Sequence, residues 1–120
     1  MAIEIRTGRI EFPSGTGLRA AAWTYFFDRL PRACWVAMSG YKARYDSSDH
    51  HIKALQVDLS TGMGVGEFGP VVHVTARLQL RDRNADDAFS GWVDYVLFCD
   101  TQRWVLDPTV INAGAERWSS

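Results

Sequence analysis

A polar segment between two apolar stretches carries the side chains best suited to chemistry. Residues 46–51 read Asp-Ser-Ser-Asp-His-His and combine two carboxylates with two imidazoles. Such groups can hold a metal ion, and His51 could act as a general base. Adjacent histidines on an extended chain point to opposite sides, so at most one of His50 and His51 joins a given site. The alternative is a turn whose side chains hydrogen-bond to the backbone.

Two motif-like spacings elsewhere lack residues that their chemistry requires. Residues 82–87 place oxygen ligands at the spacing of a calcium loop, but Asp87 stands at its glycine position and Val93 at its final acidic position. The glycines of residues 64–69 form GxGxxG, yet Pro70 and a strand pattern follow instead of the helix that would hold a pyrophosphate. The sequence therefore predicts neither calcium nor a dinucleotide as a cofactor.

The two cysteines, Cys34 and Cys99, both lie in apolar, strand-like surroundings. They are predicted to be buried reduced thiols, and a disulfide between the first and last strands is the alternative left open. Neither has a histidine close in sequence, and the chain has no GxSxG motif and no CxxC pair. The sequence thus predicts no enzyme, no metal centre and no cofactor.

Short alternating segments predict the strands that must position these side chains. The clearest is 71–80, where apolar and polar residues alternate strictly. Residues 18–30 approximate helical spacing, but Trp23-Thr-Tyr-Phe-Phe is β-prone and favours a strand. Residues 92–99 are apolar on both faces, which predicts a central strand. The other predicted strands are 2–12, 34–43, 52–59 and a short one at 104–108, with a Gly-rich loop at 60–70 and a charged loop at 81–90.

Several short strands without a βαβ unit predict an all-β chain, a small antiparallel β-sandwich of six to seven strands. Residues 1–120 are interpreted as one domain, with a core of about 3–100 and a C-terminal extension at 101–120. The net charge of −1, without a basic cluster, argues against nucleic acid as a partner. The N-terminus lacks the apolar core of a signal peptide and no apolar run reaches membrane-spanning length, so we expect cytoplasmic synthesis without membrane insertion. Release with a larger extracellular particle remains open.

Three stretches in order resemble a known family. They are Ile5-Arg-Thr-Gly-Arg-Ile10, the segment from Phe27 through Pro31 to Tyr41, and the polar loop with its following strand at 46–60. Together they resemble the H-type lectin family. The resemblance implies a six-stranded antiparallel sandwich that forms trimers or stacked trimers and binds N-acetylgalactosamine or related sugars.

The resemblance also implies which residues bind the ligand. It implies an acidic residue in the loop after Tyr41, which would be Asp46 or Asp49. A basic residue at the start of the next strand would be Lys53, where the family typically has arginine. A polar-aromatic pair of the following hairpin would fall near Arg81 and Asp82, with Trp92 or Phe89 beyond. Physically, sugar binding needs hydroxyl acceptors, a donor and an aromatic face. The predicted ligand-binding residues are Tyr41, Asp46, Asp49, His51, Lys53, Arg81, Asp82 and Trp92.

Three hypotheses follow for the function. The first is a non-enzymatic carbohydrate-binding module, a homotrimer or hexamer whose loops bind a galactose-like or N-acetylgalactosamine-like sugar near a protomer interface. The second is a structural or adhesion module of a phage tail, injection particle or toxin, in which Tyr41 and Trp92 only pack between strands or subunits. The third and weaker one is a small metal-dependent enzyme that uses Asp49, His50 and His51.

Overall fold

The computed structural model describes residues 2–46, 54–81 and 87–102, and in these residues it contains six β-strands and no helix. The all-β prediction is confirmed, and so is the preference for a strand over a helix within 18–30. No helix in this part of the chain could span a membrane. The strands are β1 (Ile3–Gly15), β2 (Arg19–Phe26), β3 (Ala33–Tyr45), β4 (Ala54–Gly66), β5 (Gly69–Arg81) and β6 (Phe89–Asp100).

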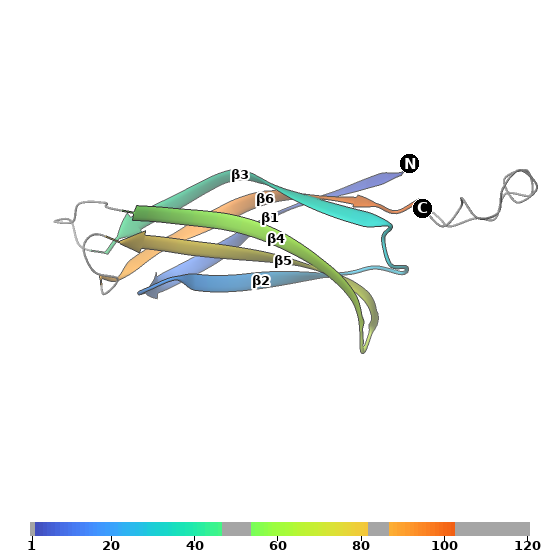
Figure 1. The fold of residues 1–120 in the computed structure, drawn as a ribbon, viewed down its shortest axis with the longest axis horizontal. Coiled ribbons are helices and arrows are strands. Elements are labelled where there is room, and N and C mark those ends of the chain that lie inside the picture. Colours follow the sequence, from blue (N-terminus) through green and yellow to red (C-terminus); the bar gives the residue numbers. More distant parts are fainter. Residues whose placement is uncertain (1, 47–53, 82–86, 103–120) are drawn as a thin grey trace, which may run out of the picture.

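The strands form two antiparallel sheets of three strands each (Figure 1). Sheet A has the order β1-β6-β3, and sheet B has the order β2-β5-β4. The central strands are therefore β6 and β5, each hydrogen-bonded on both sides. The prediction that residues 92–99 form a central strand is confirmed. The inward residues of β6 are buried and its outward residues are partly buried, which agrees with a strand that is mostly apolar on both faces.

The core lies between the sheets and comes mainly from the two central strands. In β5 every second residue from Val72 to Leu80 is buried, as the strict alternation of that segment predicts. In β6 the buried apolar positions are Phe89 and every second residue from Val93 to Cys99, and Asp100 at its end is buried as well. Ile10 and Phe12 of β1 complete a single hydrophobic cluster shared by both sheets. The arrangement is β-sandwich-like.

Two polar contacts fix sheet B against the centre of sheet A. The hydroxyls of Tyr25 and Tyr95 lie 2.5 Å apart, and their rings meet edge to face. Burial and this hydrogen bond raise the pKa of Tyr95, which keeps its hydroxyl protonated. Arg19 donates to the carbonyl oxygen of Phe89 at 3.2 Å, at the start of β6. The edge strand β2 is thus tied to the start and to the middle of the same central strand.

The β4–β5 hairpin extends through the Gly-rich stretch, so the loop predicted at 60–70 is wrong. Strand pairing continues to Gly66 and Gly69, with Glu67 and Phe68 alone forming the turn. Gly69 has a φ of +108°, a conformation that side-chain-bearing residues rarely adopt. The hairpin bends away from the other strands toward its tip (Figure 1), and Phe68 there is 80% exposed.

Several strand ends lie at the end of the molecule opposite the tip of the β4–β5 hairpin. The strand β3 ends and β4 begins there, and β5 ends and β6 begins there (Figure 1). The segments 47–53 and 82–86 join these strands and lie outside the described residues, as does the short strand predicted at 104–108.

Candidate functional site

One row of side chains on the outer face of sheet A combines an aromatic ring with opposite charges. Trp92 of β6 lies directly opposite Glu11 of β1 on one side and Lys42 of β3 on the other. Residues directly opposite on antiparallel strands project from the same face, so the three side chains are neighbours. All three face away from the core, because the buried residues of β6 are the alternate ones.

The row lines a depression of about 360 Å³ at the end of sheet A where β3 ends and β6 begins. This volume lies at the lower end of the range for small-ligand sites. Its lining offers one indole ring, one carboxylate, two cationic side chains and one hydroxyl. The lining residues are Glu11, Phe12, Pro13, Lys42, Arg44, Ser90, Gly91 and Trp92.

A neighbouring ion pair holds the indole in place. The guanidinium of Arg9 lies 4.2 Å from the centre of the Trp92 ring, and the ammonium of Lys42 lies 5.1 Å from it. Arg9 also donates two hydrogen bonds to the Asp94 carboxylate, at 2.7 and 3.1 Å. These bonds lower the pKa of Asp94 and raise that of Arg9, so both groups stay charged. A bidentate pair with fixed geometry gives Trp92 a fixed neighbour.

The other charged groups of the depression stay available for a ligand. Glu11, Lys42 and Arg44 are exposed, and in the described part of the chain none of them has an ion-pair partner. Together they offer several hydrogen-bond donors and one carboxylate acceptor around an aromatic surface. The lining of the depression includes one carboxylate, and the described residues contain no group of three metal-ligating side chains.

Of the predicted site residues, Trp92 lies in the depression and Asp46 lies close to its end of sheet A. Asp46 follows β3 directly, and its amide donates to the Ala88 carbonyl at 3.0 Å. Its carboxylate accepts a hydrogen bond from the Ser14 hydroxyl. Tyr41 pairs with Val93, a buried position, so it faces the inner side of the sheet at its edge, where it is 46% exposed. Tyr41 is therefore not part of the depression.

The remaining predicted residues are not brought to this site by the described structure. Arg81 ends β5 in sheet B, at the same end of the molecule. The predicted residues outside the described part are Asp49, His51, Lys53 and Asp82.

Sequence reasoning missed the partners of Trp92. Lys42 and Arg44 are two apart, which places them on one strand face, and this signal was present in the sequence. Glu11 had no such signal. It meets Trp92 only because β1 and β3 flank β6, and strand order is not readable from local pattern.

Two other hollows, of about 410 and 280 Å³, lie side by side between the edge strands β1 and β2. Both are lined by Arg9 and by Trp23, which is 58% exposed. Glu11 lines the larger hollow as well as the Trp92 depression, and Arg9 is already bound to Asp94. Trp23 is therefore an exposed tryptophan that lies outside the Trp92 depression, and it can serve as a matched control for Trp92.

No family model, curated protein or solved structure matches this chain. The function must accordingly be inferred from the chemistry of the site residues.

Proposed function

We propose that this protein is a non-enzymatic carbohydrate-binding module with an H-type-lectin-like β-sandwich, and that the sugar binds in the depression at Trp92. One observation carries the proposal. An indole ring held by Arg9 lies in one row with a carboxylate, Glu11, and an ammonium group, Lys42. Sugars present an apolar face of C–H groups to aromatic rings and present hydroxyls to charged side chains.

Each group has a separate task in the proposed complex. The Trp92 indole packs against the apolar face of the sugar ring. The Glu11 carboxylate accepts hydrogen bonds from two neighbouring hydroxyls, since a carboxylate has four acceptor positions. Lys42 and Arg44 donate to ring or substituent oxygens. Lys42 is exposed and flexible, so its ammonium moves off the indole when a sugar enters.

The charges of the site favour sugars that carry an acidic group. Arg9 is neutralised by Asp94, which leaves Lys42 and Arg44 against the single carboxylate of Glu11. The surplus positive charge attracts a carboxylate or sulfate on the ligand. Galactose and N-acetylgalactosamine, the sugars that the family resemblance implies, would use the same stacking surface without this contribution.

A glycan array followed by calorimetric titration tests the proposal. The array should contain galactose, N-acetylgalactosamine and uronic acid ligands, and at least one class should bind. Trp92→Ala should weaken that binding at least tenfold, about 1.4 kcal/mol, while the matched variant Trp23→Ala should leave it unchanged. Arg44→Ala should weaken binding of acidic ligands more than that of neutral ones. Array binding that survives in Trp92→Ala, or none by the folded protein, would overturn the proposal.

The second candidate, a structural module in an oligomeric assembly, is favoured by the exposed apolar side chains. Ile5 and Trp35 on the outer face of sheet A are about half exposed, and Val65 and Phe68 at the hairpin tip are more so. Large apolar surfaces on a small domain mark contact sites. The trimer or hexamer proposed for this chain would cover some of them. A sedimentation mass equal to one chain would contradict that assembly.

A further inference from the structure

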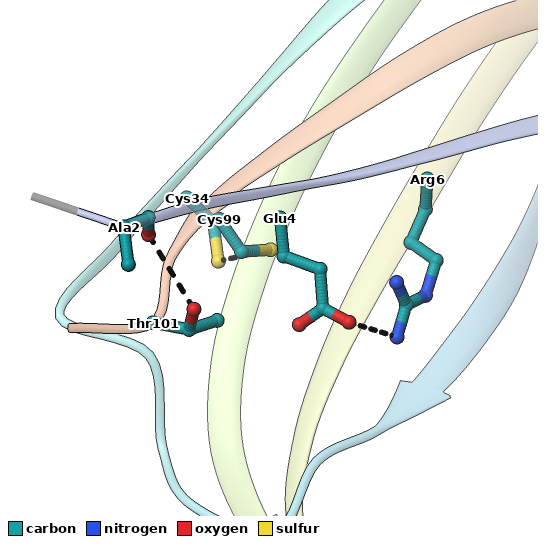
Figure 2. A network of polar contacts seen from close by, with 6 residues as sticks. All are labelled: Ala2, Glu4, Arg6, Cys34, Cys99 and Thr101. Carbon is teal, nitrogen blue, oxygen red and sulfur yellow. Dashed lines mark hydrogen bonds and ion pairs between the residues drawn. The ribbon is translucent and has the colours of Figure 1, made fainter. Parts of the chain in front are cut away.

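The two cysteines meet at one end of sheet A, where β3 begins and β6 ends, although they are 65 positions apart in sequence. Cys34 of β3 lies directly opposite Cys99 of central β6 in the strand register. Their sulfur atoms are 3.0 Å apart, and both are reduced (Figure 2). The neighbours on the other side of Cys99 belong to β1, where Glu4 is its register partner and forms an ion pair with Arg6.

The surroundings of the pair exclude other uses of these thiols. Desolvation raises the pKa of Cys34 to about 12 and also raises that of Cys99, so both thiols are mostly protonated at neutral pH and attack by either sulfur is slow there and faster at alkaline pH. In the described part of the chain no third metal-ligating side chain completes a metal site with them. The close contact of the two sulfur atoms leaves their mutual oxidation as the chemistry that the geometry supports.

We infer that Cys34 and Cys99 form a reversible redox modification site, at which a small disulfide such as oxidised glutathione converts the two thiols into a disulfide between β3 and β6. Directly opposite positions on neighbouring antiparallel strands bring the two sulfur atoms within reach of a bond, and only a short movement is needed to reach bonding distance. The site is unrelated to the Trp92 depression, so the inference does not depend on the proposed function.

The exposures of the two thiols set the order of events. Cys34 is partly exposed and Cys99 is fully buried. The Cys34 thiol loses its proton and its sulfur attacks one sulfur of oxidised glutathione, which releases one glutathione as thiolate. The Cys99 sulfur, after losing its proton, then attacks the Cys34 sulfur of the mixed disulfide and expels the second glutathione. The two released protons go to the two glutathione thiolates, so one oxidised glutathione becomes two reduced ones and the protein loses two hydrogens.

The bond would tie the central strand of sheet A to its edge strand. It would lie seven residues along β6 from Trp92, about 23 Å at strand spacing. Oxidation should therefore raise the resistance of the fold to denaturant and leave ligand binding at Trp92 unchanged. This separates failure of the redox inference from failure of the proposed function.

The experiment incubates the full chain with oxidised glutathione and follows intact mass and peptide maps. The wild-type protein should lose two hydrogen masses, with Cys34 and Cys99 in one linked peptide pair, and reducing agent should reverse the change. Cys99→Ser should stop at one glutathione adduct on Cys34, whereas Cys34→Ser should react far more slowly because Cys99 is buried.

Two results would overturn the inference, and both use the unmutated protein, so misfolding of a serine variant cannot obscure them. One is a wild-type protein that still keeps both thiols after equilibration with oxidised glutathione at pH 9, where thiolate attack is faster, although the urea-unfolded chain is fully oxidised there. The other is a wild-type protein that accumulates the glutathione adduct without closing the bond. A linked pair whose urea midpoint does not exceed that of the reduced protein would contradict the predicted tie between β3 and β6.

Discussion

Glycine at position 8 is required because a tyrosine ring occupies the space of its missing side chain. Gly8 of β1 lies opposite Tyr95 of β6, whose ring crosses toward β1 inside the core. A Cβ atom at Gly8 would lie 2.4 Å from the Tyr95 hydroxyl oxygen and 2.6 Å from the ring carbon that bears it. Tyr95 is only 1% exposed and is hydrogen-bonded to Tyr25, so the ring has little room to move. Gly8→Ala should therefore displace the ring.

The cost can be worked out from two contributions. Overpacking a core with one extra methyl group costs about 1–3 kcal/mol. Loss of the hydroxyl pair between Tyr95 and Tyr25 costs about 1 kcal/mol more. The free energy of unfolding should thus fall by roughly 2–4 kcal/mol. With a urea dependence near 2 kcal/mol per molar, the midpoint should drop by about 1–2 M.

A double-mutant cycle in urea, followed by far-ultraviolet circular dichroism, provides the assay. In a Tyr95→Leu background the ring end is gone, so Gly8→Ala should cost almost nothing or stabilise by about 0.5 kcal/mol. Gly62→Ala is the matched control, since no atom lies within 4 Å of the added Cβ. Equal costs of Gly8→Ala in both backgrounds would refute the steric explanation.

Three further predictions concern sheet A. Gly91→Ala should destabilise the fold and weaken ligand binding at Trp92, because the added Cβ would lie 1.9 Å from the Lys42 carbonyl oxygen. Urea unfolding measures the stability and calorimetry measures the binding. A variant with the stability and affinity of the wild-type protein would contradict this prediction. Alkylation of Cys34 by iodoacetamide should be slow at pH 7 and accelerate about tenfold per pH unit up to pH 9, because its pKa is about 12; a plateau below pH 9 would contradict this. The Asp94 carboxyl should titrate below its ordinary value of 3.8 in an NMR experiment, and Arg9→Met should raise the midpoint. The pKa of Asp94 is lower in the folded state than in the unfolded state. Its contribution to stability is therefore complete above the unfolded-state pKa and is lost as the pH falls through the folded-state pKa. An unchanged titration midpoint of Asp94 in Arg9→Met would contradict the role given to Arg9.

The sequence predicted strands well where side chains alternate and poorly where glycine hides the alternation. Residues 71–80 alternate strictly, and β5 follows them closely. In the Gly-rich stretch, Gly62 and Gly64 occupy the outward positions of β4, while Thr61 and Met63 occupy the inward ones. The inward and outward positions alternate there as in any strand, but the outward positions are glycines, so the sequence shows no alternation of apolar and polar side chains.

The site was predicted only in part, for a different physical reason. Trp92 was identified because an aromatic residue is needed for stacking, and the structure gives it an outward position beside opposite charges. Its partners come from strands separated from it by about 80 and 50 positions in the sequence. Their meeting depends on the order β1-β6-β3, a long-range property that hydrophobic periodicity does not determine.

The strand register of sheet A allows both candidate functions in one molecule. Ile5, Phe98 and Trp35 form an apolar row across the outer face, in the same way that Glu11, Trp92 and Lys42 form a polar one. The rows are six residues apart along the strands, about 20 Å. A second subunit covering the apolar row would therefore leave the depression at Trp92 open, and it would shield the apolar surface that a monomer exposes to water. Sugar binding and assembly make separate demands on the same face, so losing one should leave the other intact.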